Sequence, residues 1–514
     1  MTRFFKISAD IVAKLGVLFV LLVVMLTQLD KSDSRFDFFN RIYVTDVVPN
    51  YLWGFVAQLL FGCLYLCSKK SKKGTLSKRT IVMVQLVLFV VQILFVSQIF
   101  FYSGNDLRNV LTGAQNYVDG IFHVFFNEEY FQMCPNNLAL YVVYIAACQI
   151  ARVFGCNVYI LLIGMDVILA NLAVLFIQLC IREMSLDRVT AIISYVVSII
   201  LVGLSPWIVV PYTDMLSVCF SILSLYLYLR LRKREMNVTW KVVFIAIVPA
   251  IAYQLKVLNL IVLIGILLAE ILFLQKKDKP YVGQAILGVV VVIALTTCFS
   301  FCVKKVAQYT PDEDKQLSIE WFLLLGTNDS SYGQWNRDDY ELAVVQPQTK
   351  EERQELAYGE IGNRLQSYGV TGWLKHFKNK THIFYNDSSF GWCIAKGSVY
   401  QIPETTSSIT QFMRQIFFPP DNYSMYCDVT GYGKYYMYYS MLCQCVWMVI
   451  LCALCRFVWR PLGHKTREEL VLEITWIGVF LFSMLFETSA RLLISYLPIF
   501  IVMMAKGLQR SKRA

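Results

Sequence analysis

The sequence has few charged residues and few of the residue types that build metal centres. Only 16% of its 514 residues are charged, and it contains four histidines. A soluble domain of this size carries roughly 25% charged residues. No paired CxxC motifs and no histidine-rich cluster occur in the chain. These shortages argue against a soluble enzyme and against a metal centre of the zinc-finger or iron–sulfur kind.

The chain also lacks the pattern of a disulfide framework, although it has 15 cysteines. Most of them lie inside apolar runs, where a thiol serves as a small apolar residue. Cys134, Cys156, Cys393 and Cys427 fall in or near segments expected outside the membrane. The sequence leaves open whether any of these four form a bridge.

Long apolar runs are plentiful. Hydrophobic residues make up 57% of the chain, and the mean hydropathy is +0.53. A membrane-spanning helix needs about 20 mostly apolar residues, because every backbone amide must be paired inside the segment. The sequence predicts twelve such helices: 11–29, 51–68, 81–101, 157–181, 189–210, 215–231, 241–255, 257–275, 281–303, 436–456, 470–486 and 491–507.

The net charge of +11 comes from short Lys and Arg clusters between the apolar runs. This distribution is typical of the positive-inside rule and not of nucleic-acid binding. If the basic clusters lie in the cytoplasm and successive spans cross the membrane in alternate directions, residues 102 and 156 both lie outside. The chain therefore makes no net crossing between them. We therefore expect the apolar run 138–154 to lie in the outer interface, with Gln149 and Arg152 toward the lipid headgroups. The alternative is that 138–154 spans and another helix is misassigned.

These assignments divide the chain into four regions. Two N-terminal spans and a basic cytoplasmic loop occupy 1–80, and a transmembrane core occupies 81–303 with a first outer loop at 102–156. A large extracytoplasmic region follows at 304–435, and further spans with a basic tail complete 436–514.

Two acidic residues lie at the predicted outer ends of spans. Asp106 follows the third span, and Asp214 lies in the turn Pro211-Tyr-Thr-Asp between two others. A carboxylate at the membrane edge that faces a cavity can act as a general base. The structural alternative is helix capping, by Asp106 for a helix 107–118 and by Thr213 and Asp214 for the helix after them.

Two cations, Lys256 and Arg491, lie in short turns on the same predicted outer side. Cations at this face run against the positive-inside bias, and binding of a lipid phosphate would explain them. An i,i+4 ion pair of Arg491 with Glu487, or snorkelling, would explain them equally well.

The large outer region interleaves aromatic residues with Asp, Asn and Gly, around Trp335–Asp339 and around Asn386–Trp392. Flat rings stack on sugar faces, and short polar side chains bind hydroxyl groups. Ordinary folded loops show the same mixture, so this pattern only suggests a carbohydrate site.

The order of these motifs resembles that of integral-membrane glycosyltransferases of the GT-C fold, in particular the bacterial, Gram-positive, polyprenyl-phosphate-sugar-dependent branch. The matching segments are Asn105–Ala114, Cys134–Leu138, Pro211–Asp214, the Lys256 turn, Trp321–Gly326, Trp335–Asp339, Asn386–Trp392 and Glu487–Pro498. The similarity extends over nearly the whole chain from about residue 80. Asp106 is followed by Leu107 where the family often has Gln or Glu, and Cys134-Pro135 stands for the usual Tyr-Pro.

The resemblance implies an all-α polytopic fold with interfacial helices, at the bacterial cytoplasmic membrane with its active site outside. It implies sugar transfer from polyprenyl phosphate to a cell-envelope glycan, such as a teichoic acid or wall polysaccharide, or to a lipid-linked acceptor, with inversion. It implies catalytic roles for Asp106 and Asp214 and allows a divalent cation, Mg²⁺ or Mn²⁺. Its expected site residues are Lys256, Arg491 and Arg108 for the donor phosphate, and Asn105, Tyr212, Trp335, Asp338, Asp387 and Trp392 for substrate.

Two other functions fit the sequence. A polysaccharide polymerase or ligase of another fold would also have many spans and a large outer loop. A transporter or flippase for lipid-linked glycans would need polar residues inside its spans, where Asp166 and Glu270 are the exceptions in a nearly uncharged set.

Overall fold

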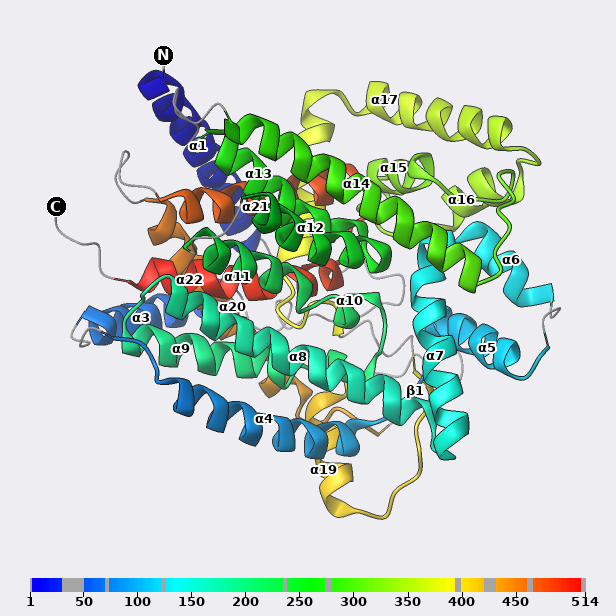
Figure 1. Ribbon diagram of the computed structural model, residues 1–514, viewed down its shortest axis with the longest axis horizontal. Helices are drawn as coiled ribbons and strands as arrows, with labels where there is room; N and C mark the ends of the chain where they lie inside the picture. Colours follow the sequence, from blue (N-terminus) through cyan, green and yellow to red (C-terminus); the bar gives the residue numbers. More distant parts are fainter. Residues whose placement is uncertain are drawn as a thin grey trace.

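A computed structural model describes most of the chain as a helical bundle (Figure 1). The described residues are 2–29, 50–69, 74–121, 125–233, 238–272, 280–392, 399–419, 431–459 and 466–509. Cys393 and Cys427 lie outside them. Cys134 and Cys156 are free thiols, so no bridge forms between these two.

Apolar helices make up the body of the protein. Within the described chain, eight helical stretches are long and apolar enough to cross a membrane: Lys78–Ile99, Pro135–Phe154, Val158–Glu183, Arg188–Val209, Thr213–Arg232, Ile286–Val306, Tyr436–Val458 and Ala490–Leu508. Shorter apolar helices lie at Lys14–Leu26, Phe55–Ser68, Trp240–Leu255 and Val257–Leu272. The prediction of a helical membrane protein is therefore confirmed, whereas the count of twelve spans stays a prediction.

Most helix bounds lie near those of the predicted segments, with three exceptions. The segment 189–210 continues after Ser198 as a π-helix (Ile199–Gly203) and a 3₁₀ helix (Pro206–Val209), 215–231 is divided between two helices, and 491–507 begins as a 3₁₀ helix (Ala490–Tyr496). The N-terminal helices are α1 (Thr2–Leu29), α3 (Asn50–Lys69) and α4 (Lys78–Ile99). The central ones are α8 (Val158–Glu183), α9 (Arg188–Ser198), α10 (Thr213–Leu216), α11 (Phe220–Arg232), α12 (Val238–Leu255), α13 (Leu260–Leu272) and α14 (Pro280–Val306). The C-terminal ones are α20 (Tyr436–Val458), α21 (Arg467–Leu485) and α22 (Leu497–Leu508).

The first outer loop folds into three further helices at one end of the bundle. They are α5 (Asn105–Val118), α6 (Phe125–Met133) and α7 (Leu138–Phe154). In Figure 1, α4, α8 and α9 run lengthwise, and α7 runs across their ends instead of continuing beside them. By length and composition this segment could also span. Its transverse direction supports the predicted interfacial position, which stays a prediction.

A small β-sheet adds to the all-helical prediction. Strand β1 (Tyr102–Ser103) pairs antiparallel with β2 (Val399–Gln401), with Tyr102 opposite Gln401 and Ser103 opposite Val399. This pairing joins the start of the first outer loop to the large outer region. The residues just before Asp106 are therefore held by a segment almost 300 positions further along the chain.

Among its described residues, the large outer region contributes four α-helices: α15 (Ile319–Thr327), α16 (Arg337–Tyr340), α17 (Lys350–Tyr385) and α19 (Ser408–Phe417). Helix α17 begins at a capping box, in which Thr349 and Glu352 each bind the other's backbone amide. It bends at Gly369, whose φ of 55° is the left-handed conformation that glycine tolerates best. Figure 1 shows its first part lying along the outside of the bundle.

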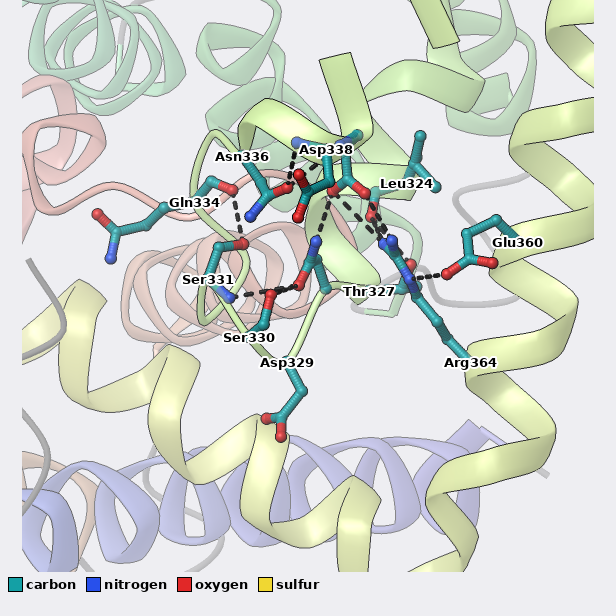
Figure 2. A network of polar contacts seen from close by, with 12 residues as sticks. Leu324, Thr327, Asp329, Ser330, Ser331, Gln334, Asn336, Asp338, Glu360 and Arg364 are labelled. Atoms are coloured by element: carbon teal, nitrogen blue, oxygen red, sulfur yellow. Dashed lines mark hydrogen bonds and ion pairs between the residues drawn. The ribbon is translucent and has the colours of Figure 1, made fainter. Parts of the chain in front are cut away.

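A buried ion pair joins α16 to α17. Arg364 Nη2 lies 2.5 Å from Asp339 Oδ1, and the Asp339 side chain is 1% exposed. Arg364 also binds Glu360, at 2.8 Å from Nε to Oε1, and donates to the Leu324 carbonyl at 2.9 Å. Figure 2 shows how these groups converge on the guanidinium. The other Asp339 oxygen accepts from Asn328 Nδ2 at 2.8 Å, so both oxygens are satisfied.

We expect Arg364→Met to lower the free energy of unfolding by about 3–5 kcal/mol, because Asp339 would keep a buried charge without its partner. Equilibrium unfolding in mixed micelles measures this loss. Arg337→Met is the matched control, since the Arg337 side chain is 77% exposed and faces Glu341 at 3.7 Å. It should change the free energy of unfolding by about 0–1 kcal/mol. Equal losses in the two variants would contradict a structural role for the buried pair.

Candidate functional site

Three turns from distant parts of the chain meet around Asp214. The Asp214 side chain is 4% exposed, and its Oδ1 accepts a hydrogen bond from Lys256 Nζ. Its Oδ2 lies 3.8 Å from Arg491 Nε. Lys256 precedes the 3₁₀ turn Val257–Asn259, and Arg491 lies in the 3₁₀ helix Ala490–Tyr496. The carboxylate therefore holds Lys256 and Arg491, two of the three cations predicted for the donor phosphate.

The predicted capping roles of the two acids are wrong. Helix α10 has Tyr212 at its N-cap position, and Thr213 and Asp214 lie inside its first turn. Helix α5 begins at Asn105 with Gly104 at its N-cap position, so Asp106 also lies in a first turn instead of capping. A carboxylate in a first turn still gains from the helix dipole, but its oxygens stay free to face the site.

Tyr212 connects the two acids. Its hydroxyl lies 3.4 Å from Asp106 Oδ2 and 3.3 Å from Asn137 Oδ1. The Asn137 amide in turn donates to the Tyr130 hydroxyl at 2.6 Å. The Arg491 guanidinium carbon is 5.7 Å from the centre of the Tyr212 ring, a cation–π distance. Asp106 is exposed, whereas Asp214 is buried.

Asp106 and Asp214 belong to one electrostatic site. The charges of both act on Arg491 and on Tyr212. They therefore lie in one site, with the exposed Asp106 at the Tyr212 hydroxyl and the buried Asp214 beside Lys256 and Arg491. Burial lowers the pKa of the Lys256 ammonium, and the adjacent Asp214 charge opposes that fall.

Glu487 is a third acid at this site, and it was not among the predicted site residues. Burial raises its pKa above the ordinary value of 4.5, Arg491 opposes the rise, and Asp106 adds to it. In the sequence, Glu487 lies in the same outer turn as Arg491. This shared turn was the sequence feature that could have identified Glu487 as a site residue. Thr488, the next residue, donates its backbone amide to Gly333 O at 2.7 Å, so the large outer region packs against this turn.

The other predicted residues lie in varied surroundings. Arg108 stacks on the Tyr400 ring, with 3.7 Å from its guanidinium carbon to the ring centre, and so points toward the β1–β2 sheet. Asn105 is exposed beside Asp106, with a φ of 50°. Trp335 is 44% exposed near Tyr340, and Asp338 is exposed on α16. Contact of these four with substrate stays a prediction.

Two of the predicted substrate residues occupy structural positions. Asp387 accepts from the amides of Ser389 and Gly391, at 2.8 and 2.7 Å, and thereby closes a turn. Trp392 is 2% exposed and donates its indole proton to Phe417 O at 2.7 Å. These contacts give Asp387 and Trp392 a structural role. Their proposed contact with a sugar stays a prediction.

The acids at this site do not suit a divalent cation. Both Asp214 oxygens already face cations, and a divalent ion beside Lys256 and Arg491 would be repelled. In the part of the chain that the structure describes, no group of three His, Cys, Asp or Glu side chains is placed to hold a metal. The Mg²⁺ or Mn²⁺ that the resemblance allowed therefore has no matching ligand set between Asp106 and Asp214.

Fold and site together define a polytopic α-helical membrane protein with a charged cluster at one end of the bundle. The chain belongs to the family described as conserved hypothetical integral membrane protein, whose model matches residues 6–512. No curated protein and no solved structure matches the chain. Membership places the protein in a lipid bilayer.

We expect Glu487→Gln to change how stability depends on pH. Because the folded state holds the Glu487 proton more tightly than the unfolded chain does, its stabilising contribution is complete below pH 4.5 and is lost as pH rises through the folded pKa. The variant should therefore gain stability over the wild type as pH rises above 4.5, by at most about 1.4 kcal/mol per pH unit. Thermal unfolding across that range measures the difference.

The exposed Glu404→Gln provides the control, and it should follow the wild type at every pH. A Glu487→Gln protein whose stability parallels the wild type throughout would show that the Glu487 proton is held no more tightly in the folded state.

Proposed function

We propose that this protein is a membrane glycosyltransferase of the GT-C type that moves a sugar from a polyprenyl-phosphate donor to a cell-envelope glycan or lipid-linked acceptor at the outer face of a bacterial membrane. The supporting observation is the convergence of an exposed carboxylate, Asp106, with two cations, Lys256 and Arg491, around Tyr212. An acid and a cation pair so arranged provide the two charges that this transfer needs.

In this mechanism, Asp106 accepts the proton from an acceptor hydroxyl. The hydroxyl oxygen attacks the anomeric carbon, and the bond from that carbon to the phosphate oxygen breaks with inversion. The phosphate leaves with the bonding electrons, and the proton passes from Asp106 to water. The exposure of Asp106 suits this role, because an acceptor must reach the base and the base must then release its proton.

Lys256 and Arg491 stabilise the charge that develops on the departing phosphate. Asp214 is the one carboxylate in direct contact with the two cations, so it offsets only one of their two positive charges, while Glu487 and Asp106 add negative charge nearby. Asp214 thus acts by fixing the cations in place before the donor binds. Cationic groups that are already in position need no reorganisation when charge develops on the phosphate. Each such group contributes a few kcal/mol of transition-state stabilisation.

The location of the cluster suits a lipid-linked donor. It is built from turns that flank the apolar segments Arg188–Val209, Thr213–Arg232, Trp240–Leu255 and Val257–Leu272. A polyprenyl chain that stays in the bilayer would bring its phosphate to the level of these turns. This placement supports the enzyme over a flippase, whose polar path would have to continue through the spans.

We expect Asp106→Asn to reduce turnover by about 10²–10⁴-fold, because the acceptor hydroxyl would lose its general base. Release of polyprenyl phosphate from radiolabelled polyprenyl-phosphate sugars, in the presence of candidate acceptors, measures turnover. Asp119→Asn is the matched control, since Asp119 is exposed at the other end of α5. Full activity in Asp106→Asn would remove this residue from the mechanism.

A second prediction separates the catalytic and structural parts of the cluster. Lys256→Met should both abolish transfer and destabilise the fold by about 3–5 kcal/mol, because Asp214 would remain buried with a weaker partner. Adding Asp214→Asn should restore most of the stability, since the stranded charge is then gone. Turnover should stay at least about 10²-fold low in the double variant, because a phosphate-binding cation is still missing.

Thermal unfolding and the release assay on the same preparations test this pair. A double variant that regains wild-type turnover would show that Lys256 serves only to neutralise Asp214.

A further inference from the structure

A buried carboxyl group lies in the spanning helix α8, outside the cluster described above. Asp166 is 0% exposed, and neither of its carboxyl oxygens has a hydrogen-bond partner among the described residues. Burial is the dominant influence on its charged form. An ionisable residue at such a position in a membrane helix calls for a functional explanation.

The protonation state follows from the cost of burial. Burying an isolated carboxylate in a medium of low dielectric constant costs far more free energy than burying a neutral polar group without a partner. A bound cation would also neutralise Asp166, but it would need a cage of several oxygen ligands. Both Asp166 oxygens lack polar neighbours at hydrogen-bonding distance in the described chain. A proton is the ligand that fits.

The position of Asp166 relates it to the proposed active site. It lies eight residues after Val158, the first residue of α8, or about 12 Å along the helix. Tyr144 of α7 is fully buried within electrostatic reach of Asp166 and also of Tyr212. The Tyr144 hydroxyl donates a hydrogen bond to the carbonyl of Pro211. Tyr144 therefore contacts the turn that contains Tyr212 and Asp214 and is also affected by the charge of Asp166.

We propose that Asp166 is a membrane-embedded proton-binding site and that Tyr144 couples its protonation to the Pro211–Asp214 turn. The Tyr144 hydroxyl has a single proton to donate. While Asp166 is neutral, that proton binds the Pro211 carbonyl and fixes the turn. An ionised Asp166, which makes no hydrogen bond to Tyr144 in this structure, acts on that hydroxyl through its charge and draws the proton away from the Pro211 carbonyl. Loss of the Asp166 proton therefore loosens the turn.

The other titratable side chains that act on Tyr144 in the described chain are Tyr159, Tyr212 and Cys148, all neutral near pH 7. Helices α4, α9, α10, α11 and α22 also pack against α8. They carry charged side chains, including Asp214 on α10, but none of these forms a hydrogen bond with Asp166 in the described chain.

Infrared spectroscopy of the full-length protein in lipid nanodiscs tests the proton directly. The wild-type spectrum at neutral pH should contain the carbonyl stretch of a protonated carboxylic acid that is missing from Asp166→Asn. The exposed Asp119→Asn should leave this band unchanged. A wild-type spectrum without the band would overturn the proposal. A band that appears only when Na⁺ is removed would also overturn it and would make Asp166 a cation site.

Titration to high pH tests the coupling. Wild-type protein should lose the carboxylic acid band and thermal stability together as pH rises, because a charge is then forced into the bilayer. Asp166→Asn should not show this loss of stability. Tyr144→Phe should still lose the band, but the Pro211–Asp214 turn should no longer respond. The response of the turn is followed with an environment-sensitive label at Ser489→Cys, close to Arg491. The same label response in Tyr144→Phe and wild type would exclude Tyr144 as the link.

This experiment does not depend on sugar transfer. The band and the label response remain measurable if no glycosyltransferase activity is found, and the release assay remains valid if Asp166 proves to be ionised.

Discussion

The contact of Asp214 with Lys256 and Arg491 is the interaction on which the rest of the site depends. A carboxylate that is almost fully buried at a membrane edge is stable only with cations beside it. Each cation comes from a different turn, so the ion cluster also fixes how the segments after α9, α12 and α21 meet. Tyr212, two residues before Asp214, contacts Asp106 on the first outer loop through its hydroxyl group. One buried charge thus organises both the fold at this end and the chemistry proposed for it.

The bilayer explains why such a cluster can exist where it does. Spanning helices pair their own backbone groups, and the polar residues left over gather in the turns that join them. The turns face water on one side and apolar helix on the other, so charges there interact strongly without being sealed off. A lipid phosphate meets the same boundary from the bilayer side. The proposed transfer therefore takes place where base, cations and both substrates can reach one another.

The sequence predicted the helices well because long apolar runs have one stable form in a membrane. It also predicted that Asp106, Asp214, Lys256 and Arg491 lie near one another, from the alternation of basic clusters and from the resemblance. It could not predict the β1–β2 pairing, since strands of two and three residues carry no periodic pattern and their partners are distant in sequence. The capping roles were wrong because helix starts shift by a residue or two, which decides whether an acid caps the helix or lies inside its first turn. Glu487 was missed as a site residue because only tertiary packing brings it toward Asp106 and Lys256.

The most direct test is a cryo-EM structure of the protein in nanodiscs with polyprenyl phosphate bound. The account predicts phosphate density in contact with Lys256 and Arg491, on the side from which Asp106 is reached, with the prenyl chain entering the bilayer between helices. Ordered phosphate density elsewhere on the protein, with Lys256 and Arg491 still engaged only by Asp214, would contradict it.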